Sequence, residues 1–451
     1  MKLKSFIIGT AAALSVASMA IADRGSDGHV NIIYWQAPSI LNPYLSGGTK
    51  DVESSSMIIE PLARYNQDGE LTAWLVNEIP TVANGGVSAD LMSITWNITP
   101  GIKWSDGSAF TAHDVVFSGN YCMDPDGGCA QSNKLADVAN IEALDDLTVK
   151  VTFSVAKPFP YGPFVGAEQP IIQKAQFADC MGAKAPECTA ENFGPIGTGP
   201  FVVTDFKAND VITMEANPHY RDASKPAFAS VTFKGGGDAA AAARSVLETG
   251  EFDYAWNLQI DPTILANMAA VGKGTVISSF GTATERLMVN LSNPDPALGD
   301  LRSTLEGGPH PFLTDAAVRR ALSVSIDRNL LAEVGYGAAG KATCNIVPGP
   351  AIYVSTANDE CLVQDIAKAN NILEAAGWQR GSDGIRAKDG VRLSILYQTS
   401  TNAVRQDTQA MVKQWWSEIG VETELKNISA SVFFGGDQSS PDTYQKHFSD
   451  I

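Results

Sequence analysis

Cysteine and histidine are the residue types in this sequence whose spacing could close disulfides or bind a metal. The six cysteines form three pairs of near neighbours: Cys122 with Cys129, Cys180 with Cys188, and Cys344 with Cys361. An even count in local pairs favours three disulfides in an oxidising compartment, although other pairings remain open. The five histidines are scattered and no C-x-x-C occurs, so the spacing of a zinc site is absent. The sequence therefore predicts disulfides, no metal centre and no cofactor.

Motifs for covalent catalysis and phosphate binding are missing or incomplete. The sequence has no G-x-S-x-G nucleophile elbow, no H-E-x-x-H and no Walker sequence. The run Gly235-Gly236-Gly237-Asp238 could bind an anion with its backbone amides, but no Lys-Ser/Thr follows it. Asp238 as the N-cap of a helix is the favoured interpretation. We therefore expect no enzyme, with a secreted hydrolase as the remaining catalytic alternative.

Residues 1–22 are typical of a secretory signal peptide. Lys2 and Lys4 precede an apolar stretch from Phe6 to Met19, and Ala20-Ile21-Ala22 fits the small-x-small cleavage pattern. The alternative is an uncleaved membrane anchor, for which the apolar stretch is short. We therefore predict a cleaved, soluble product in the periplasm.

Net charge limits the classes of partner, and chain length limits the number of domains. The formal charge of −18 argues against nucleic acid and anionic membranes as partners. A chain of 451 residues is long enough for two or more domains. We expect a monomer that binds no nucleic acid.

Strand-like and helix-like segments alternate through the mature chain, which predicts an α/β protein. Strands are expected at 30–35, 93–98 and 148–153. Helices are expected after a capping box at Thr111 and Asp114, over 315–328 with Thr314 at the start, over 365–376 with Gly377 at the end, and over 403–419.

Six ordered segments carry a resemblance to a known family. Residues 89–117 include the run W-N-I-T-P-G-I-K-W-S-D-G, which resembles the signature of the bacterial family-5 extracellular solute-binding proteins. The other segments are 197–201 (G-T-G-P-F), 217–221 (N-P-H-Y-R), 318–328 with Pro348 after it, 368–378 and 411–421. The matches span nearly the whole mature chain, so the sequence is identified as similar to that family.

The resemblance implies an α/β, two-lobed fold of the type II periplasmic-binding-protein kind, with mixed sheets. The implied first lobe contains 23–62 and 196–285 and carries an inserted subdomain at 63–195, and 286–451 belong to the second lobe. Ligand would lie between the lobes, which close over it by a hinge motion. Members of the family continue further along the second lobe, so we expect that lobe to be incomplete here. A truncated gene product is the favoured reason, and a compact variant is the alternative.

The resemblance also implies a function. Family members include binding proteins for oligopeptides, dipeptides, nickel and opines, and they deliver their ligand to an ABC permease and its ATPase. We therefore predict a periplasmic component of an ABC importer that captures peptides. Another solute such as an opine or an oligosaccharide is the alternative, and nickel is less favoured because no His or Cys cluster lines the expected loops. A truncated scaffold with a chaperone role or no function is a further alternative.

The family's ligand or hinge contacts correspond to two groups of residues in the first lobe. Trp35 ends the first expected strand, and Gln36, Asn42 and Tyr44 follow it. Tyr254, Trp256 and Asn257 follow a helix, where the two rings could form an apolar wall and the amide could bond a peptide backbone. Packing of the rings in the core is an equal alternative.

A third group lies in the second lobe, between a strand and the helix at 403–419. It contains Thr399, Ser400, Asn402 and Arg405. In dipeptide binders, the matching loop helps to hold the carboxylate of the ligand through an arginine. Thr399 and Ser400 stand where that charge is expected, so strict dipeptide recognition is not expected.

Overall fold

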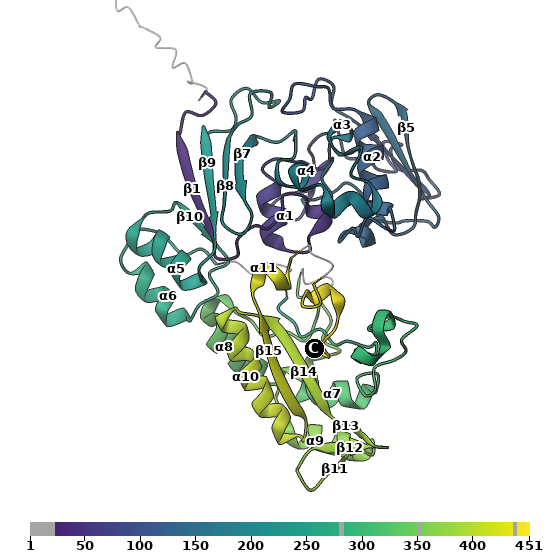
Figure 1. The fold of residues 1–451 in the computed structure, drawn as a ribbon, viewed down its shortest axis with the longest axis vertical. Helices are drawn as coiled ribbons and strands as arrows, with labels where there is room; N and C mark the ends of the chain where they lie inside the picture. The colour runs from purple at the N-terminus through teal and green to yellow at the C-terminus, as the bar shows by residue number, and fades with distance from the viewer. Residues whose placement is uncertain (1–22, 279–283, 350–353, 436–439) are drawn as a thin grey trace, which may run out of the picture.

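Two lobes make up the computed structural model, which describes residues 23–278, 284–349, 354–435 and 440–451 (Figure 1). The predicted signal peptide at 1–22 lies outside the described residues. Among the helices of the described ranges, none combines the length and apolarity needed to cross a bilayer.

A five-stranded mixed sheet forms the centre of the first lobe. In sheet order its strands are β10 (Tyr254–Trp256), β1 (His29–Tyr34), β9 (Ser230–Gly235), β8 (Val211–Ala216) and β7 (Phe201–Lys207). β1 pairs in parallel with both β9 and β10, and β8 pairs antiparallel with its two neighbours. The side chains of β1 alternate between two cores, because successive residues of a strand point to opposite faces. Ile33 packs against α5 (Ala239–Arg244) and α6 (Pro262–Ala269), and Tyr34 packs into the larger core on the other face.

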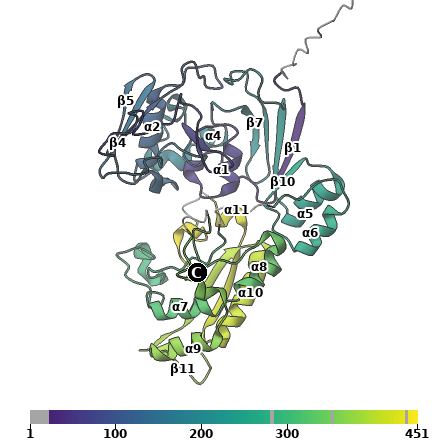
Figure 2. The ribbon, with the colours of Figure 1, turned by 180° about the vertical axis from the view of Figure 1, so that it is seen from behind.

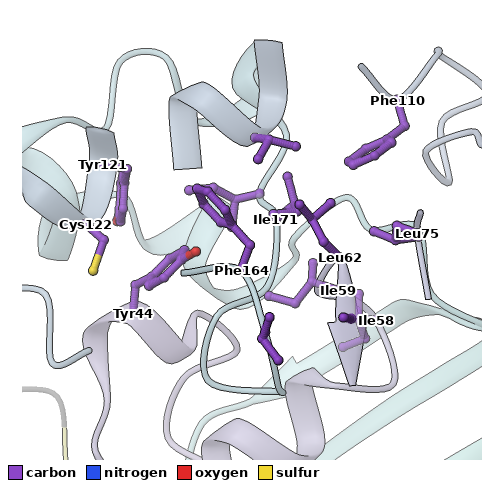
Figure 3. Close-up of a cluster of buried hydrophobic side chains, with 14 of the residues drawn as sticks. Tyr44, Ile58, Ile59, Leu62, Leu75, Phe110, Tyr121, Cys122, Phe164 and Ile171 are labelled. Atoms are coloured by element: carbon purple, nitrogen blue, oxygen red, sulfur yellow. The ribbon is translucent and has the colours of Figure 1, made fainter. Parts of the chain in front are cut away.

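Between β1 and β7 the chain builds the rest of the first lobe. Its elements are α1 (Thr49–Ser55), β2 (Ala63–Tyr65), β3 (Leu71–Ala73), β4 (Ser93–Asn97), α2 (Ala112–Met123), β5 (Val138–Asp145), β6 (Thr148–Phe153), α3 (Lys174–Phe177) and α4 (Thr189–Phe193). The capping box predicted at the start of α2 is confirmed, since the Asp114 carboxylate accepts the Thr111 backbone N–H at 3.0 Å. One continuous core joins these elements to the loop after β1, and Figure 3 shows part of it, with Tyr44, Tyr121 and Cys122 near one another.

The second lobe is organised around a parallel pair of strands, β14 (Ser394–Ser400) and β15 (Glu422–Ile428). The helix α10 (Ala403–Glu418) connects them, as a parallel pair requires. The remaining helices and short strands are α7 (Ala316–Val324), α8 (Arg328–Tyr336), α9 (Ile366–Ala375), α11 (Ala430–Phe433), β11 (Gln379–Arg380), β12 (Arg386–Lys388) and β13 (Val391–Arg392). In Figures 1 and 2, α6 of the first lobe lies next to α8 of the second, on one side of the molecule.

The helix predicted over 315–328 is wrong in extent. α7 ends at Val324, and Asp327 caps a new helix, α8, by accepting the Leu330 N–H at 3.0 Å. The predicted start at Thr314 is also wrong, because the Asp315 side chain caps α7 and the Thr314 hydroxyl donates to the His310 carbonyl. An aspartate at an N-cap competes with helix continuation, which explains the break. By contrast, the predicted cap at Asp238 is confirmed, since its carboxylate accepts the Ala241 N–H at 2.7 Å.

Three disulfides close the loops that the cysteine spacing predicted. Cys122 is bonded to Cys129, Cys180 to Cys188, and Cys344 to Cys361. The first two lie in the segment between β1 and β7, and the third lies in the second lobe. The predicted pairing is therefore confirmed.

Candidate functional site

A cavity of about 750 Å³ lies between the two lobes. Its first-lobe wall comes from the end of α2, the disulfide loop 122–129, the 3₁₀ turn η2 (Ser132–Leu135) and the start of β5. Its second-lobe wall comes from Thr443, His447 and the 3₁₀ turn η8 (Tyr444–Lys446) between them. Its volume falls within the range of clefts that bind small ligands.

The first-lobe wall is held in shape by the Cys122–Cys129 disulfide and by hydrogen bonds within and behind the loop. The Asp124 carboxylate accepts the Asp126 N–H at 3.0 Å, which forms a tight turn. The Ala130 N–H donates to the Tyr44 carbonyl at 2.8 Å and so joins the loop to the segment after β1. This wall is therefore prepared before a ligand arrives.

Asn42 and Tyr44, which the sequence suggested as ligand contacts, lie fully buried beneath this wall. The Asn42 amide donates to Tyr121 Oη at 3.1 Å and to Asn192 Oδ1 at 2.9 Å. Tyr44 Oη donates to the Pro170 carbonyl at 2.5 Å, and burial raises the pKa of this phenol. Their hydrogen-bonding groups are used inside the lobe, so the structure assigns both residues to supporting the wall.

The second-lobe wall reaches the first lobe through a small aromatic group. Tyr444 packs against Phe433 and Phe434, with ring centroids 5.9 and 5.8 Å away. The Ser46 hydroxyl donates to the Phe434 carbonyl at 3.4 Å across the lobes. Gly47 approaches Tyr444 so closely that a Cβ there would clash with its hydroxyl. The two walls thus meet through a segment in which glycine is needed for close approach.

A second set of contacts joins the lobes at the end of β14. Asn402 caps α10 by accepting the Arg405 N–H at 3.0 Å, and its amide donates to Gln259 Oε1 of the first lobe at 2.5 Å. The Arg405 guanidinium forms two 3.0 Å hydrogen bonds with the Glu285 carboxylate. We call these four residues the crossing cluster: Gln259, Glu285, Asn402 and Arg405. Thr399 and Ser400 are buried just before it, and the Ser400 hydroxyl accepts from Arg405 at 3.3 Å.

The remaining predicted site residues lie at the ends of β1 and β10. Trp35 is buried, and its indole N–H donates to the Asn257 carbonyl at 2.9 Å. Gln36 is also buried. Trp256 stacks on Tyr34 with centroids 4.9 Å apart, whereas Tyr254 is half exposed. The structure brings Trp35 and Asn257 into contact, and it keeps this group apart from the residues that line the cavity.

The residues that line the cavity were missed by the sequence-based predictions. The sequence patterns predict a disulfide within 122–138 and no site residue within 443–447. The usable signal was the disulfide closing a Met-Asp-Pro-Asp-Gly-Gly loop, because a short clamped loop of this kind presents its side chains in fixed positions. Among the described residues, the only cluster of metal-ligand types is Cys180, Cys188 and Glu191, whose two sulfurs are joined in a disulfide.

Comparison with known sequences identifies the family. The family model described as bacterial extracellular solute-binding proteins, family 5 Middle, matches residues 74–448. Protein XP55 of Streptomyces lividans is 28% identical over 426 residues, which cover 94% of this chain and 71% of that protein. The periplasmic murein peptide-binding protein MppA of Escherichia coli is 26% identical over 419 residues, covering 86% of this chain and 69% of that protein.

Comparison with solved structures agrees on the fold. The oligopeptide-binding protein AppA from Bacillus subtilis, solved with a nonapeptide, superposes with a TM-score of 0.73 at 20% identity and covers 94% of this chain and 78% of its own. The E. coli murein tripeptide binding protein MppA gives a TM-score of 0.66 at 21% identity, with 90% and 76% covered. The predicted mixed α/β binding-protein fold and the predicted family resemblance are both confirmed. The chain therefore belongs to the bacterial extracellular solute-binding proteins of family 5.

Proposed function

We propose that this protein is the periplasmic binding component of an ABC importer that captures peptides between its lobes and delivers them to the permease and ATPase. The observation that carries the proposal is the cavity of about 750 Å³ with one wall from each lobe. Relatives described as oligopeptide-binding and murein peptide-binding proteins support a peptide as the ligand. Export by cleavage after Ala22 is part of the proposal.

The lobe boundaries belong to the same proposal. We take 23–62 and 196–285 as the first lobe, 63–195 as its inserted subdomain and 286–451 as the second lobe. Two separate buried cores support the boundary between the lobes, one containing Trp96 and Phe233 and the other containing Trp378 and Trp416. The inserted subdomain shares the first of these cores with the rest of its lobe. The inserted subdomain would then supply one wall of the ligand site.

Capture requires the lobes to close, and the contacts between them support a hinge beside the crossing cluster. The Asn402–Gln259 and Arg405–Glu285 contacts join the lobes at the crossing cluster, and the Ser46–Phe434 contact joins them beside the cavity. A rotation about the first set would open the second, which is the geometry of hinged binding proteins. No covalent chemistry is needed in this scheme, and we propose no enzymatic activity.

The test is native mass spectrometry of the protein purified from the periplasm, followed by calorimetry with the peptides it releases. We expect a mature chain that begins at Asp23 and carries a mixture of peptides. A single non-peptide solute, such as an opine or an oligosaccharide, would replace the peptide proposal while keeping the importer role. Hydrolysis of bound peptides that a cavity substitution abolishes would instead indicate an enzyme.

A further inference from the structure

A second cavity, of about 480 Å³, lies in the second lobe. Its lining comes from residues 289–292, from Leu305, Gly308 and Pro309, and from His447. His447 also lines the cavity between the lobes, so the two cavities adjoin at this residue. A ligand held between the lobes therefore has the second cavity within reach of one of its substituents.

The surface of this second cavity is mainly apolar, in contrast to the cavity between the lobes. Val289, Leu291, Leu305 and Pro309 supply its hydrocarbon. The Leu291 side chain is half exposed, and that of Leu305 is 94% exposed. Two exposed leucines at one cavity present apolar surface to water, and a bound apolar group would remove that surface from water.

The polar side chains of residues 289–292 are occupied by hydrogen bonds within the lobe. The Asn290 amide N–H donates to the His447 carbonyl at 2.7 Å, and the Asn290 amide oxygen accepts the Ser292 N–H at 2.9 Å and the Ser292 hydroxyl at 2.7 Å. The backbone is bonded across the cavity floor as well, since the Asn293 N–H donates to the Gly308 carbonyl at 3.0 Å. A polar ligand group placed here would lose water without gaining an equal partner, whereas an apolar group has no such cost.

The junction of the two cavities is polar. The His447 imidazole has no hydrogen-bond or ion-pair partner among the described residues. Burial lowers the pKa of this imidazole, so the ring is neutral at neutral pH. A ligand that passes His447 therefore moves from a polar cavity with charged lining residues into an uncharged and mainly apolar one.

We infer that the second cavity selects one bulky apolar side chain of the bound peptide. This inference rests on the proposed function: the main chain of the peptide lies between the lobes, and one side chain passes His447 and covers Leu291 and Leu305. Hydrogen bonds to the main chain of a peptide do not depend on its sequence. Selection therefore arises only at the position that reaches the second cavity, and the ligand class is peptides with an aliphatic or aromatic residue at one fixed position.

The probes are pentaalanine, the five peptides in which leucine replaces one alanine, and the five in which asparagine replaces one alanine. Asparagine is close to leucine in size and differs from it in polarity, so the two sets separate apolar selection from filling of space. Calorimetry measures each probe with the wild-type protein and with the variants Leu305→Asn and Leu291→Asn. Leu144→Asn is the matched control, since it makes the same change at an exposed leucine of β5 that lines neither cavity. Peptides released from the periplasmic preparation are sequenced by mass spectrometry as a second readout.

We expect leucine at one position to raise wild-type affinity over pentaalanine by about 5- to 50-fold, because the added carbons leave water. Asparagine at that position should give no gain. Leu305→Asn and Leu291→Asn should each reduce the ratio of leucine to alanine affinity by about threefold or more, and Leu144→Asn should keep the wild-type ratio. The released peptides should be enriched in aliphatic or aromatic residues at one position.

Three results would overturn the inference while leaving the proposed function intact. The first is released peptides with no apolar enrichment at any position, and the second is a leucine gain that both cavity variants retain. The third is a wild-type dimer that Leu305→Asn converts to a monomer, which would assign this leucine to a contact between copies. If the preparation contains no peptide and no probe binds, the proposed function fails and this inference fails with it. Thermal unfolding of each variant separates these outcomes from loss of fold.

Discussion

The carboxylate of Glu60 and the guanidinium of Arg221, 161 residues apart, form two hydrogen bonds of 2.7 and 3.2 Å in the interior of the first lobe. Glu60 is fully buried and also accepts from the Thr198 hydroxyl at 2.9 Å and from the Trp74 indole at 2.7 Å. This one carboxylate joins the segment after α1 to two of the sequence motifs that identify the family.

Substitution of Arg221 by glutamine should lower the free energy of unfolding by about 3 to 5 kcal/mol, because it leaves a buried carboxylate without its cation. The double variant with Glu60→Gln should lose less than the sum of the single variants. Urea unfolding measures both. Lys234→Gln removes the exposed pair with Asp210 and serves as the control, with an expected change below about 1 kcal/mol. Equal losses for the Lys234 and Arg221 variants would contradict this account.

The Tyr34 hydroxyl donates to Glu53 Oε2 at 2.5 Å, and this contact predicts a pH dependence of stability. Burial raises the pKa of the Glu53 carboxyl above its usual value of 4.5, and the Tyr34 hydrogen bond lowers it again in part. The folded state therefore keeps this proton to a higher pH than the unfolded state. For this group, stability falls as pH rises from the unfolded pKa through the folded pKa.

Tyr34→Phe removes the bond that lowers the Glu53 pKa, so the loss of stability should extend to higher pH than in the wild type. Glu53→Gln should remove this component of the pH dependence altogether. Urea unfolding between about pH 4 and pH 8 checks both variants. Stability curves that run parallel to the wild type for both would contradict the prediction.

Gly47→Ala should weaken ligand binding by about 5- to 100-fold, as expected when an added methyl overpacks a closed contact. The new Cβ would clash with Tyr444 Oη and lie 2.9 Å from Gln445 Nε2. Calorimetry gives the affinity. With ligand bound, X-ray scattering should show a larger radius of gyration for the Gly47→Ala variant than for the wild type. Gly194→Ala is the control, since its Cβ would meet only the Ala190 carbonyl at 3.5 Å. Partial recovery in Gly47→Ala with Tyr444→Phe would support the clash as the cause.

Replacing Cys122 and Cys129 by serine should weaken ligand binding, because the disulfide fixes a wall of the cavity. Replacing Cys180 and Cys188 is the matched control, since that disulfide closes a loop of similar length and none of residues 180–188 lines the cavity. Each replacement should cost about 2 to 3 kcal/mol of stability on the chain-entropy account. Calorimetry should show lost affinity for the first pair alone. Equal ligand affinities of the wild type and the Cys122/Cys129 variant would show that the wall keeps its shape without the disulfide.

Local structure could be predicted from the sequence wherever the cause was local. The alternating pattern at 148–153 coincides with β6, and Gly377 ends the helix α9 with a φ of +88°. The helix break at Val324 could not be read from apolar periodicity, because Val318, Leu322 and Ile326 all enter one core on both sides of the break. Only the capping role of Asp327 reveals it.

The candidate site was harder to predict, since its walls come from segments about 300 residues apart in the chain. Conspicuous polar residues near strand ends, such as Asn42, were suggested as ligand contacts and lie in the core. The Asn42 amide is buried because it donates hydrogen bonds to both Tyr121 and Asn192. These two contacts depend on the tertiary fold. Asp124 and Lys446 lie far apart in the sequence, and they line one cavity only in the folded protein.

The order of strands in the first sheet also constrains how the chain can fold. Among the described strands, β1 pairs with β9 and β10, and Trp35 contacts Asn257, which lies 222 residues later in the chain. Loop closure over that distance is slow and entropically costly. The segment between β1 and β7 carries two disulfides that each close a short loop, so it can reach its native structure earlier. In a chain that folds as it emerges, β1 therefore stays unpaired until about 200 further residues have been synthesised.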